Sequence, residues 1–476
     1  MPKVLIAGGG VHGTFLSHAL TRTGALDTDD ITVLDPHPEP LEVWRRQTRA
    51  TGMRYLRSPS SHNLDLDFRA LREFARRGGA GVTGGTGVTG GAGVTGGAGV
   101  TGGAGAGGSD AGASFIPPYA RPALELFNAH ARTLIEETGL AALRRRARLL
   151  DVEARRDGVR VKTDAGEDGA DFLILAVGRT EMPFRPSWAR SLPRGRGGAD
   201  PRGGADPRGG ADPRGGADPR IVHVFDPDFD PGRFEQAAAP VVVGGGVTAA
   251  QVACHAAERS GRRVVLLTRG PLRVRQFDSA PCFIGPRCLA AFLAEPTPAA
   301  RRRYIEEARY PGTMPWDVER TLLADERVAI LEREVAGIEP AGAGAAAGRR
   351  LRLHLRGEVS PVESDLVVLA TGFERRLPLS HIISDLAHRH DLPTGPFGSP
   401  VPDLYLRWHP RVLVTGALGE LEIGPAAPNI IGAHLAARRL VPFFRGEGGR
   451  RDVGARASRH GAADIAWTAL VHYLET

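Results

Sequence analysis

Two segments of the chain share an arrangement that few folds accommodate. In each, a short apolar run leads directly into three consecutive glycines, and an amphipathic stretch follows. The first copy passes through GGGVHG at residues 8–13 to Gly24, and the second passes through GGGVTAAQVA at residues 244–253 to Gly261. An apolar run, a glycine turn and an amphipathic stretch predict a buried strand, a tight turn and a helix. Two such units predict an α/β protein with two doubly wound, Rossmann-like domains that bind dinucleotides.

The glycines of the first copy have the spacing of a dinucleotide-binding turn. Gly8 permits the tight turn, Gly10 lets the backbone approach a pyrophosphate, and Gly13 lets the helix pack closely on the strand. The start of the helix would present backbone amides and the positive end of its dipole. The next strand, residues 31–34, ends at Asp35, where a carboxylate can accept hydrogen bonds from a ribose. The alternative is a glycine-rich turn that binds no ligand.

The second copy differs from the first at the end of its second strand. Gly244, Gly246 and Ala249 occupy the three positions of the glycine spacing, but the strand at residues 264–267 is followed by Thr268 and Arg269 instead of an acid. An arginine can pair with a 2′-phosphate that a carboxylate would repel, so this copy predicts a preference for NADPH over NADH. Other arginines close in sequence are alternatives for this role, as is a solvated arginine without one; they are Arg262, Arg263, Arg273 and Arg275.

Three further segments have the form of strands that lead the chain toward a bound cofactor. They read DFLILAVG, DLVVLATG and RVLVTG and end at Gly178, Gly372 and Gly416. A helical stretch after Gly424 could direct its first amides at the pyrimidine edge of a flavin, because the positive helix end favours the anionic reduced ring. We therefore assign these four glycines to cofactor binding. As an alternative, the three runs are simply core strands of an α/β sheet.

These motifs together resemble the class B flavoprotein monooxygenases, and most of all the lysine and ornithine N-hydroxylase branch. The resemblance rests on the two glycine motifs, on LATGF at residues 369–373, on residues 53–68, and on His223 ahead of the second motif. Two departures are that Phe373 stands where the family usually has tyrosine, and that the histidine fingerprint of the Baeyer-Villiger and flavin-containing branches is missing. The resemblance implies an FAD domain that is split by an NADPH domain.

The resemblance also implies a reaction. NADPH would reduce FAD, molecular oxygen would form a C4a-hydroperoxyflavin, and one oxygen atom would pass to a heteroatom of a small molecule, with an amine nitrogen as the expected acceptor. Arg57, Asn63 and His223 are candidates for polar groups around that intermediate. Each is also compatible with a purely structural role, since His62 or Asn63 would serve as the N-cap of a helix over residues 64–74.

Two other functions remain open from the sequence. One is an NADPH-dependent FAD oxidoreductase that does not insert oxygen; its disulfide-using form needs a CxxC motif, whereas Cys282 and Cys288 have five residues between them. The other is a non-catalytic flavin-binding protein whose glycine-rich segments contact a partner. Turnover of NADPH would exclude this last function.

Low-complexity repeats divide the chain into its expected domains. GVTGGA-type hexads cover residues 81–104, within a glycine-rich insert at residues 78–113, and GGADPR repeats cover residues 197–220. We expect both tracts to be flexible surface segments, because short repeats without an apolar period cannot bury a face. The expected domains are residues 1–192 (FAD, first part), 193–220 (linker), 221–362 (NADPH) and 363–476 (FAD, second part).

Composition limits the partners. The 61 basic and 54 acidic side chains give a net charge of +7, but no block of five like charges occurs, so we expect no nucleic-acid partner. No apolar run reaches the roughly 20 residues of a membrane span, which predicts no membrane partner. The missing secretory leader and the three cysteines predict a cytoplasmic location without a disulfide scaffold. We expect no metal site, and the sequence carries no signal for an oligomeric state.

Overall fold

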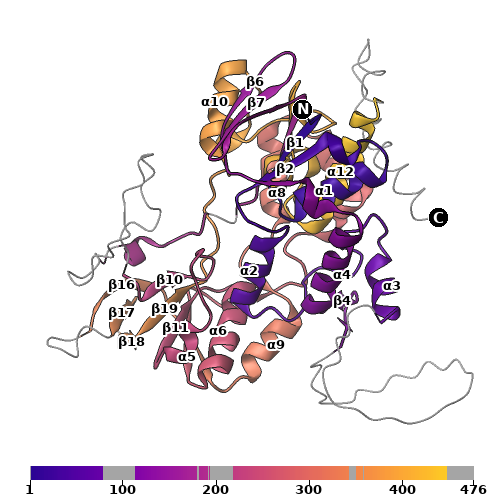
Figure 1. Cartoon of the computed structure of the whole chain (residues 1–476). Helices are drawn as coiled ribbons and strands as arrows, with labels where there is room; N and C mark the ends of the chain where they lie inside the picture. Colours follow the sequence, from indigo (N-terminus) through magenta and orange to yellow (C-terminus); the bar gives the residue numbers. More distant parts are fainter. Residues whose placement is uncertain are drawn as a thin grey trace, which may run out of the picture. The chain divides into compact units, whose positions relative to one another are not determined.

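The computed structural model of the chain describes residues 2–78, 113–179, 182–190, 192, 218–341, 350–357 and 359–446. The chain divides into two compact units. One consists of Arg54–Thr138, and the other of Met1–Met53 together with Gly139–Thr476. The larger unit contains both glycine motifs, and Figure 1 labels many of its strands and helices.

The first sheet of the larger unit contains the first glycine motif. Its strands have the order β20-β21-β9-β1-β2-β5, and all neighbours run parallel except β20, which is antiparallel to β21. β1, which precedes the motif, lies between β9 and β2, so the strand order reverses beside it. The strands are β1 (Val4–Ala7), β2 (Ile31–Asp35), β5 (Arg144–Arg146), β9 (Phe172–Leu175), β20 (Arg407–His409) and β21 (Val412–Val414).

The second sheet contains the second glycine motif and is entirely parallel. Its order is β10-β19-β11-β12-β15, and β11, which precedes the motif, lies between β19 and β12. The order therefore reverses beside the motif here as well. The strands are β10 (Ile221–His223), β11 (Pro240–Val243), β12 (Val264–Thr268), β15 (Val328–Glu332) and β19 (Leu366–Leu369).

Strand β19 belongs to the second sheet, which corrects the expected domain boundary at residue 363. This strand, which begins the LATGF segment, pairs with β10 and β11 of the second sheet and not with the first sheet. The chain passes between the two sheets in two antiparallel crossings, where Phe184 donates to Gly372 and Glu374 donates to Met182, both at 2.8 Å. The second sheet therefore extends to residue 369.

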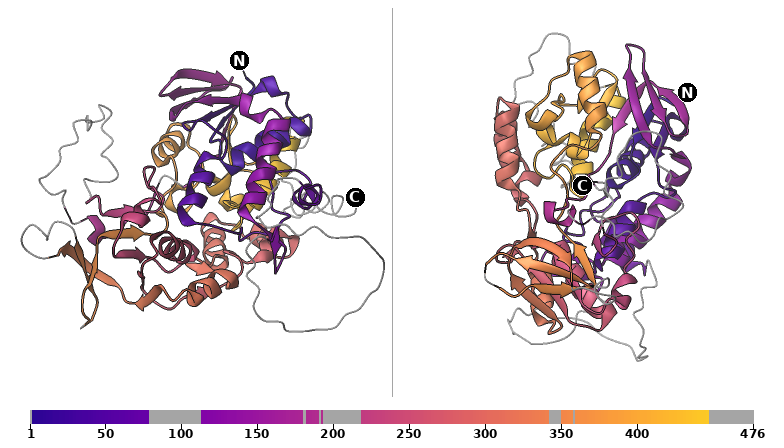
Figure 2. Two further views of the ribbon diagram at one scale, coloured as in Figure 1. Left: turned by 60° about the horizontal axis from the view of Figure 1, so that its bottom comes forward. Right: turned by 90° about the vertical axis from the view of Figure 1, so that its left-hand side faces the viewer.

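Each sheet is covered differently on its two faces. Three-stranded antiparallel sheets cover one face of each: β6–β8 over the first sheet, and β16–β18 over the second. Helices cover the other faces, with α1 beside α12 at the first sheet (Figures 1 and 2) and α6 against β11 and β12 at the second. The expected pair of Rossmann-like domains is confirmed, with an antiparallel layer on one face of each. The covering strands are β6 (Leu149–Ala154), β7 (Val159–Thr163), β8 (Gly166–Ala170), β16 (Val335–Pro340), β17 (Leu351–Leu355) and β18 (Val362–Ser364).

Helices of the larger unit connect these layers. The two that follow the glycine motifs are α1 (Val11–Arg22) and α6 (Val247–Ser260), close to the lengths that the sequence predicts. A short parallel pair, β13 (Arg273–Val274) and β14 (Thr313–Met314), flanks the second motif. The remaining helices are α2 (Glu42–Thr51), α5 (Arg233–Gln236), α7 (Pro286–Ala294), α8 (Pro298–Ala308), α9 (Trp316–Ala324), α10 (Ser380–His390), α11 (Glu420–Ile423) and α12 (Ile430–Phe444).

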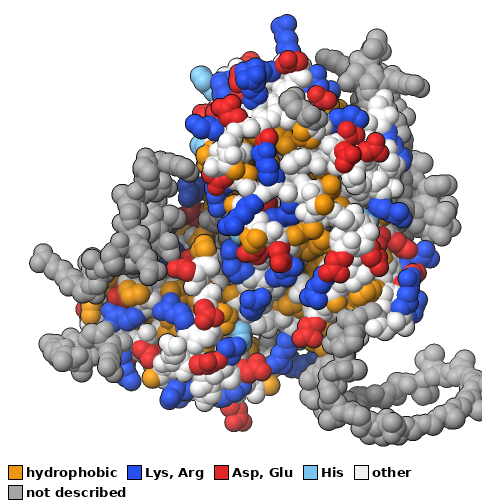
Figure 3. All heavy atoms as spheres, in the orientation of Figure 1, with side chains coloured by type: hydrophobic (Ala, Val, Ile, Leu, Met, Phe, Trp, Pro, Cys, Tyr) orange, Lys and Arg blue, Asp and Glu red, His pale blue; other side chains and the backbone are white. Residues whose placement is uncertain are grey.

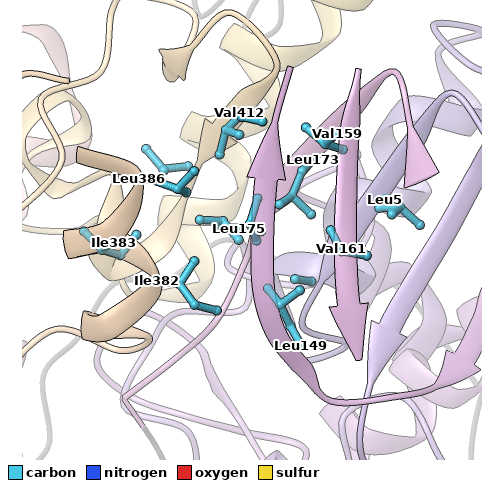
Figure 4. Packing of buried hydrophobic residues seen from close by; sticks show 14 of the residues in the cluster. Leu5, Leu149, Val159, Val161, Leu173, Leu175, Ile382, Ile383, Leu386 and Val412 are labelled. Atoms are coloured by element: carbon cyan, nitrogen blue, oxygen red, sulfur yellow. The ribbon is translucent and has the colours of Figure 1, made fainter. Parts of the chain in front are cut away.

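A continuous apolar core joins the first sheet to its antiparallel layer. Leu5, Leu173 and Leu175 of the sheet pack against Val159 and Val161 of β7, and the apolar face of α10 closes the cluster (Figure 4). Alternate residues of β7 are buried, as its period-two pattern requires. Burial of this kind contributes roughly 25 cal/mol per Å² of apolar surface. Packing against the antiparallel layer therefore holds the strands next to the first motif in place on one face of the sheet.

The smaller unit is built on a different pattern. It contains α3 (Ala70–Arg76), α4 (Leu124–Glu137) and the short antiparallel pair β3 (Phe115–Ile116) and β4 (Arg121–Pro122). The helix expected over residues 64–74 is wrong in its start, because residues 61–68 form turns and the helix begins at Ala70 after Arg69. The Asx-type hydrogen bonds of Asn63, described below, favour these turns over a helix.

Several expectations concern parts of the chain that lie outside the described residues. The hexads at residues 81–104 do, as do the GGADPR repeats except for residues 218–220. Among the described residues, no helix is both long and apolar enough to cross a bilayer. On the face that Figure 3 shows, cationic and anionic side chains are interspersed. One pairing was not expected: Cys282 and Cys288 form a disulfide between the short 3₁₀ turn Pro281–Ile284 and α7.

Candidate dinucleotide-binding sites

The first glycine loop is shaped by close backbone packing. A Cβ atom at Gly8, whose φ is +110°, would lie 2.7 Å from the carbonyl oxygen of Ala176, and a Cβ at Gly13 would lie 1.8 Å from the carbonyl oxygen of Gly8. Both positions therefore require glycine. Gly10 differs, because a Cβ there would meet no atom within 4 Å. Open space beside Gly10 is the feature that lets a ligand approach the loop backbone.

Asp35 closes this loop from the end of β2. Its Oδ2 accepts a 2.5 Å hydrogen bond from the amide of Gly9, and its Oδ1 accepts 2.9 Å bonds from the amide and Nδ1 of His37. Burial alone would raise the pKa of Asp35, but the His37 and Gly9 hydrogen bonds and the nearby Arg144 guanidinium outweigh it and hold the pKa below its usual value. The carboxylate is thus ionised at neutral pH and can accept ribose hydroxyls.

Residues from the far end of the chain complete the first site. His12, inside the first motif, contacts Thr415 Oγ1 through Nδ1 at 2.9 Å and the Asn429 carbonyl oxygen through Nε2 at 3.2 Å. Burial lowers the pKa of His12 to about 4, although the carbonyls of Asn429 and Ala427 oppose the shift. A neutral His12 thereby fixes the start of α12 and the turn at Gly416 against the first loop.

The second loop repeats this packing with one substitution. A Cβ at Gly244, whose φ is +154°, would lie 2.4 Å from the carbonyl oxygen of Ala370, and a Cβ at Gly246 would lie 3.1 Å from Cα of Gly312. Ala249 stands where the first loop has Gly13, and its own Cβ would lie 2.9 Å from a Cβ at Gly244. Gly244 therefore has to be glycine for two reasons.

Arginines surround the end of β12 beside this loop. Arg269 is exposed directly after Thr268, as the sequence predicts. Arg273 donates from Nη2 to the carbonyl oxygen of Pro311 at 2.6 Å and lies 3.3 Å from a Cβ placed on Gly312, the residue that touches Gly246. Arg273 is therefore held beside Gly312, the residue next to the loop, whereas Arg269 is exposed. Both carry the positive charge that a 2′-phosphate requires.

The predicted cofactor residues thus gather at two places. Gly372 belongs to the second place, because it follows β19 and accepts from Phe184. Gly424 faces α7, since a Cβ there would lie 3.6 Å from side-chain atoms of Leu289 and Phe292. The first place collects Gly8, Gly10, Gly13, Asp35, Gly178 and Gly416, and the second collects Gly244, Gly246, Ala249, Arg269 and Gly372.

The three candidate catalytic residues are distributed over both units. Arg57 and Asn63 belong to the smaller unit, where Asn63 is fully buried; its Nδ2 donates to the carbonyl oxygens of Ser60, Asp67 and Phe68 at 3.2–3.4 Å and its Oδ1 accepts from Asp65. These bonds give Asn63 a structural task. Its catalytic role, and that of Arg57, stays a prediction.

His223 lies in β10 of the larger unit and is fully buried. Its Nδ1 accepts from the amide of Phe225 at 3.2 Å, and Asp226 accepts from both the His223 amide and Arg185. Burial and the Arg185 charge lower the pKa of His223 to about 3, against the opposing effect of the Gly372 carbonyl. His223 is neutral at physiological pH, and its catalytic role likewise stays a prediction.

Arg144 is a residue of the first site that the sequence did not single out. Its side chain is only 7% exposed, donates from Nη2 to the carbonyl oxygen of His37 at 2.6 Å and lies 3.4 Å from Asp35. A Cβ at Gly9 would lie 2.9 Å from Nη1 of Arg144, so a guanidinium underlies the first loop. Arg144 is one of three consecutive arginines, which on sequence alone are typical of a solvated strand edge.

Both loops fit the pyrophosphate of a dinucleotide. α1 and α6 begin after Gly10 and Gly246, and a glycine has no side chain that could cap the first amides of the helix. The first amides of each helix are therefore left for an anion, at the edge where open α/β sheets bind ligands. Within the described residues, no group of three or more His, Cys, Asp or Glu side chains is arranged to hold a metal ion.

Of the comparisons with known proteins, only the one with solved structures found matches. No protein-family profile matches the chain, and no curated protein sequence does. Among solved structures, the cadaverine monooxygenase of desferrioxamine biosynthesis from Erwinia amylovora, solved with FAD, has a TM-score of 0.62 at 14% identity, over 94% of this chain and 95% of that one. L-lysine 6-monooxygenase from Pseudomonas syringae has a TM-score of 0.61 at 16% identity, over 94% and 99%.

The chain shares the fold of these monooxygenases. A bacillithiol disulfide reductase from Staphylococcus aureus is also similar, with a TM-score of 0.51 at 14% identity over 94% of this chain and 98% of that one. The structural similarity to the two amine monooxygenases is greater than the similarity to this reductase. At these identities it concerns the arrangement of the two dinucleotide-binding domains.

Proposed function

We propose that this protein is an FAD-dependent, NADPH-using monooxygenase that inserts one oxygen atom into a heteroatom of a small molecule, with an amine nitrogen as the acceptor. The observation that carries the proposal is the pair of glycine loops, each beside a strand-order reversal of its own sheet. An acid at the first strand end and arginines at the second support FAD at the first loop and NADPH at the second. The fold shared with a cadaverine and a lysine monooxygenase supports the choice of an amine.

In this proposal, the chain's own residues bind and orient the two cofactors. The α1 amides and the open side of Gly10 hold the FAD pyrophosphate, Asp35 accepts the ribose hydroxyls, and His12 keeps the Gly416 turn in place. The α6 amides hold the NADPH pyrophosphate, and the arginines after β12 hold its 2′-phosphate. Bound FAD would supply the redox chemistry, taking a hydride from NADPH and reacting with molecular oxygen.

The acceptor amine has to be neutral to act as a nucleophile. A protonated amine is disfavoured where arginines outnumber carboxylates, because like charges lower the pKa of an ammonium group. Such a surplus of arginines over carboxylates occurs at α11. Two glutamates there, Glu420 and Glu422, form ion pairs with five arginines, which are Arg179, Arg301, Arg302, Arg309 and Arg439.

The decisive experiment is stoichiometry. Purified holoprotein is supplied with NADPH, oxygen and a panel of amines, and NADPH loss, oxygen uptake, hydrogen peroxide and hydroxylamine product are measured together. A monooxygenase yields one hydroxylamine per NADPH and oxygen consumed for at least one amine. Oxygen uptake that yields only hydrogen peroxide with every amine would reject the proposal in favour of an oxidoreductase.

The Cys282–Cys288 disulfide supports a second candidate, a disulfide-using NADPH oxidoreductase, which also agrees with the bacillithiol disulfide reductase fold. NADPH-dependent reduction of a small disulfide, abolished by Cys282→Ser and Cys288→Ser, would favour it. Retention of full activity in both variants would exclude it.

A further inference from the structure

Cys282 and Cys288 form a disulfide that the proposed monooxygenase reaction does not use. Both side chains are half-buried, and they pack against an apolar cluster that is formed by α7, α8 and Leu421 of α11. A partly exposed disulfide can be attacked by the thiolate of a small molecule, whereas a fully buried one is protected. The bond is therefore open to exchange while the protein stays folded.

The disulfide fixes the start of α7. Cys282 lies in the 3₁₀ turn before this helix, and Cys288 lies in its first turn. Between them, the amide of Gly285 donates to the carbonyl oxygen of Cys282 over 3.3 Å, which is longer than the usual range of about 2.7–3.2 Å. α7 has only 9 residues, and helices shorter than about 12 residues are marginal without outside support. The covalent bond is such a support.

Helix α7 in turn supports the segment that leads from α11 to α12. A Cβ at Gly424 would lie 3.6 Å from a side-chain atom of Leu289 in α7. Arg301 of α8 joins the same two parts, because it donates to the carbonyl oxygen of Leu293 at 3.1 Å and to that of Leu421 at 2.9 Å. The end of α7 and the turn at Gly424 are thus held together.

The same segment contacts the first glycine loop. The carbonyl oxygen of Asn429 lies 3.2 Å from Nε2 of His12, which belongs to the first motif. The side chain of Asn429 also donates to Oδ1 of Asp278 at 3.2 Å, and Asp278 lies just ahead of Cys282 in the chain. The segment from α11 to α12 is therefore bound on both sides of the disulfide, and it passes these contacts on to the loop.

We infer that Cys282 and Cys288 are a thiol–disulfide exchange site, and that opening their bond weakens the hold of the first loop on FAD. A dithiol supplies the electrons. One of its thiolates attacks Sγ of either cysteine and breaks the S–S bond, and its second thiolate displaces the resulting mixed disulfide. The protein ends with two thiols, and the dithiol, having given up two electrons and two protons, ends as a disulfide.

Opening the bond leaves the start of α7 with noncovalent contacts alone. The segment that carries Gly424 and Asn429 then loses order, and FAD has to restore that order when it binds. Ordering costs conformational entropy, which is subtracted from the free energy of binding. A disulfide with a purely structural role has a different outcome, because reduction would then lower Tm and leave FAD binding unchanged. The inference rests on the proposed placement of FAD at the first loop.

The test measures FAD release from the holoprotein. The protein is held in buffer with dithiothreitol or with oxidised dithiothreitol and then diluted, and flavin fluorescence reports the dissociation rate constant. A thiol titration should show two more thiols in the reduced protein. We expect the rate constant to rise fivefold or more on reduction and to return on reoxidation. Hydrogen exchange should become faster at residues 420–430 and stay unchanged in β7.

The double variant Cys282→Ser, Cys288→Ser should release FAD at the rate of the reduced wild type in both buffers. Cys254→Ser is the matched control, since Cys254 lies in α6 and outside the disulfide. It should respond to the two buffers as the wild type does.

Three results would overturn the inference: equal FAD release in the two buffers when the thiol titration shows reduction, no gain of thiols with dithiothreitol, or a redox response that persists in the double variant. Protein that binds FAD equally in both states loses this inference and retains the proposed function. Protein that binds no FAD in either state loses both.

Discussion

The most direct test of the first site is to add a single methyl group at Gly13. A Cβ there would lie 1.8 Å from the carbonyl oxygen of Gly8, and no side-chain rotation can relieve a clash between Cβ and backbone. A contact of roughly 3.3 Å would require the start of α1 and the loop to separate by about 1.5 Å. Gly13→Ala therefore moves the α1 amides away from the position of the pyrophosphate.

Two magnitudes follow from that displacement. Overpacking of a rigid site costs about 1–3 kcal/mol of stability, which in a domain of this size lowers Tm by roughly 2–4 °C per kcal/mol. Loss of one hydrogen bond to a charged phosphate costs about 1.5–3 kcal/mol of binding, so FAD affinity should fall roughly tenfold to a hundredfold. FAD Kd is measured by flavin fluorescence during titration of the apoprotein, and Tm by scanning calorimetry.

Two controls separate this effect from a general glycine effect. Gly337→Ala introduces a methyl group at a position with no neighbour within 4 Å, and should change neither quantity. Ala249→Gly removes the methyl group at the matching position of the second loop; it should cost about 1 kcal/mol of helix stability and leave FAD affinity unchanged. Wild-type FAD affinity and Tm in Gly13→Ala would refute the role assigned to the first loop.

Three further changes have defined outcomes. Arg269→Ala should reduce the ratio of kcat/KM for NADPH to that for NADH about tenfold to a hundredfold if Arg269 holds the 2′-phosphate; if the ratio falls only in Arg273→Ala, Arg273 holds it instead. Because His223 stays neutral to about pH 3 while the unfolded chain protonates near 6.5, its contribution to the free energy of unfolding is fully present above pH 6.5 and falls by about 2 kcal/mol by pH 5. His223→Gln should flatten that slope in urea titrations at the two pH values, and an unchanged slope would contradict the assignment. Glu420→Gln should lower the free energy of unfolding by about 3–5 kcal/mol, since Arg302 then lacks its buried counter-charge; a loss below 1 kcal/mol would show that the cluster is solvated.

The sequence predicted the two strand–turn–helix units well, because the residues that determine each unit are close together in the chain. The strand, turn and helix of each copy are set by residues within about 15 positions of one another, and the observed bounds of α1 and α6 agree with the expected stops near Gly24 and Gly261. The helix expected over residues 64–74 failed for a local reason as well. Asn63, Asp65 and Asp67 each accept from the amide two residues later, which favours turns over a helix.

The place of β19 shows where local signals end. Its sequence, LVVL, has the same apolar character as FLIL in β9, so nothing within either strand indicates which sheet it joins. The choice depends on register with a partner: β9 aligns with β1, and β19 with β11. The chain leaves the first sheet through residues 182–184 and returns to it after β19 through residues 372–374, which pair with them. The boundary at residue 363 was therefore wrong by one strand.

Charge placement is the least predictable part of the candidate site, and for a physical reason. Glu420 meets Arg179, Arg302 and Arg309 across 241, 118 and 111 residues of chain. In a chain whose basic residues are arginine except for Lys3 and Lys162, no arginine stands out by type. What distinguishes Arg179 from the solvated arginines is burial beside a fully buried carboxylate, and burial is a property of the folded chain. The sequence could indicate where two dinucleotides would bind, whereas the surplus of arginines around Glu420 became visible only once strands β9 and β21 lay side by side.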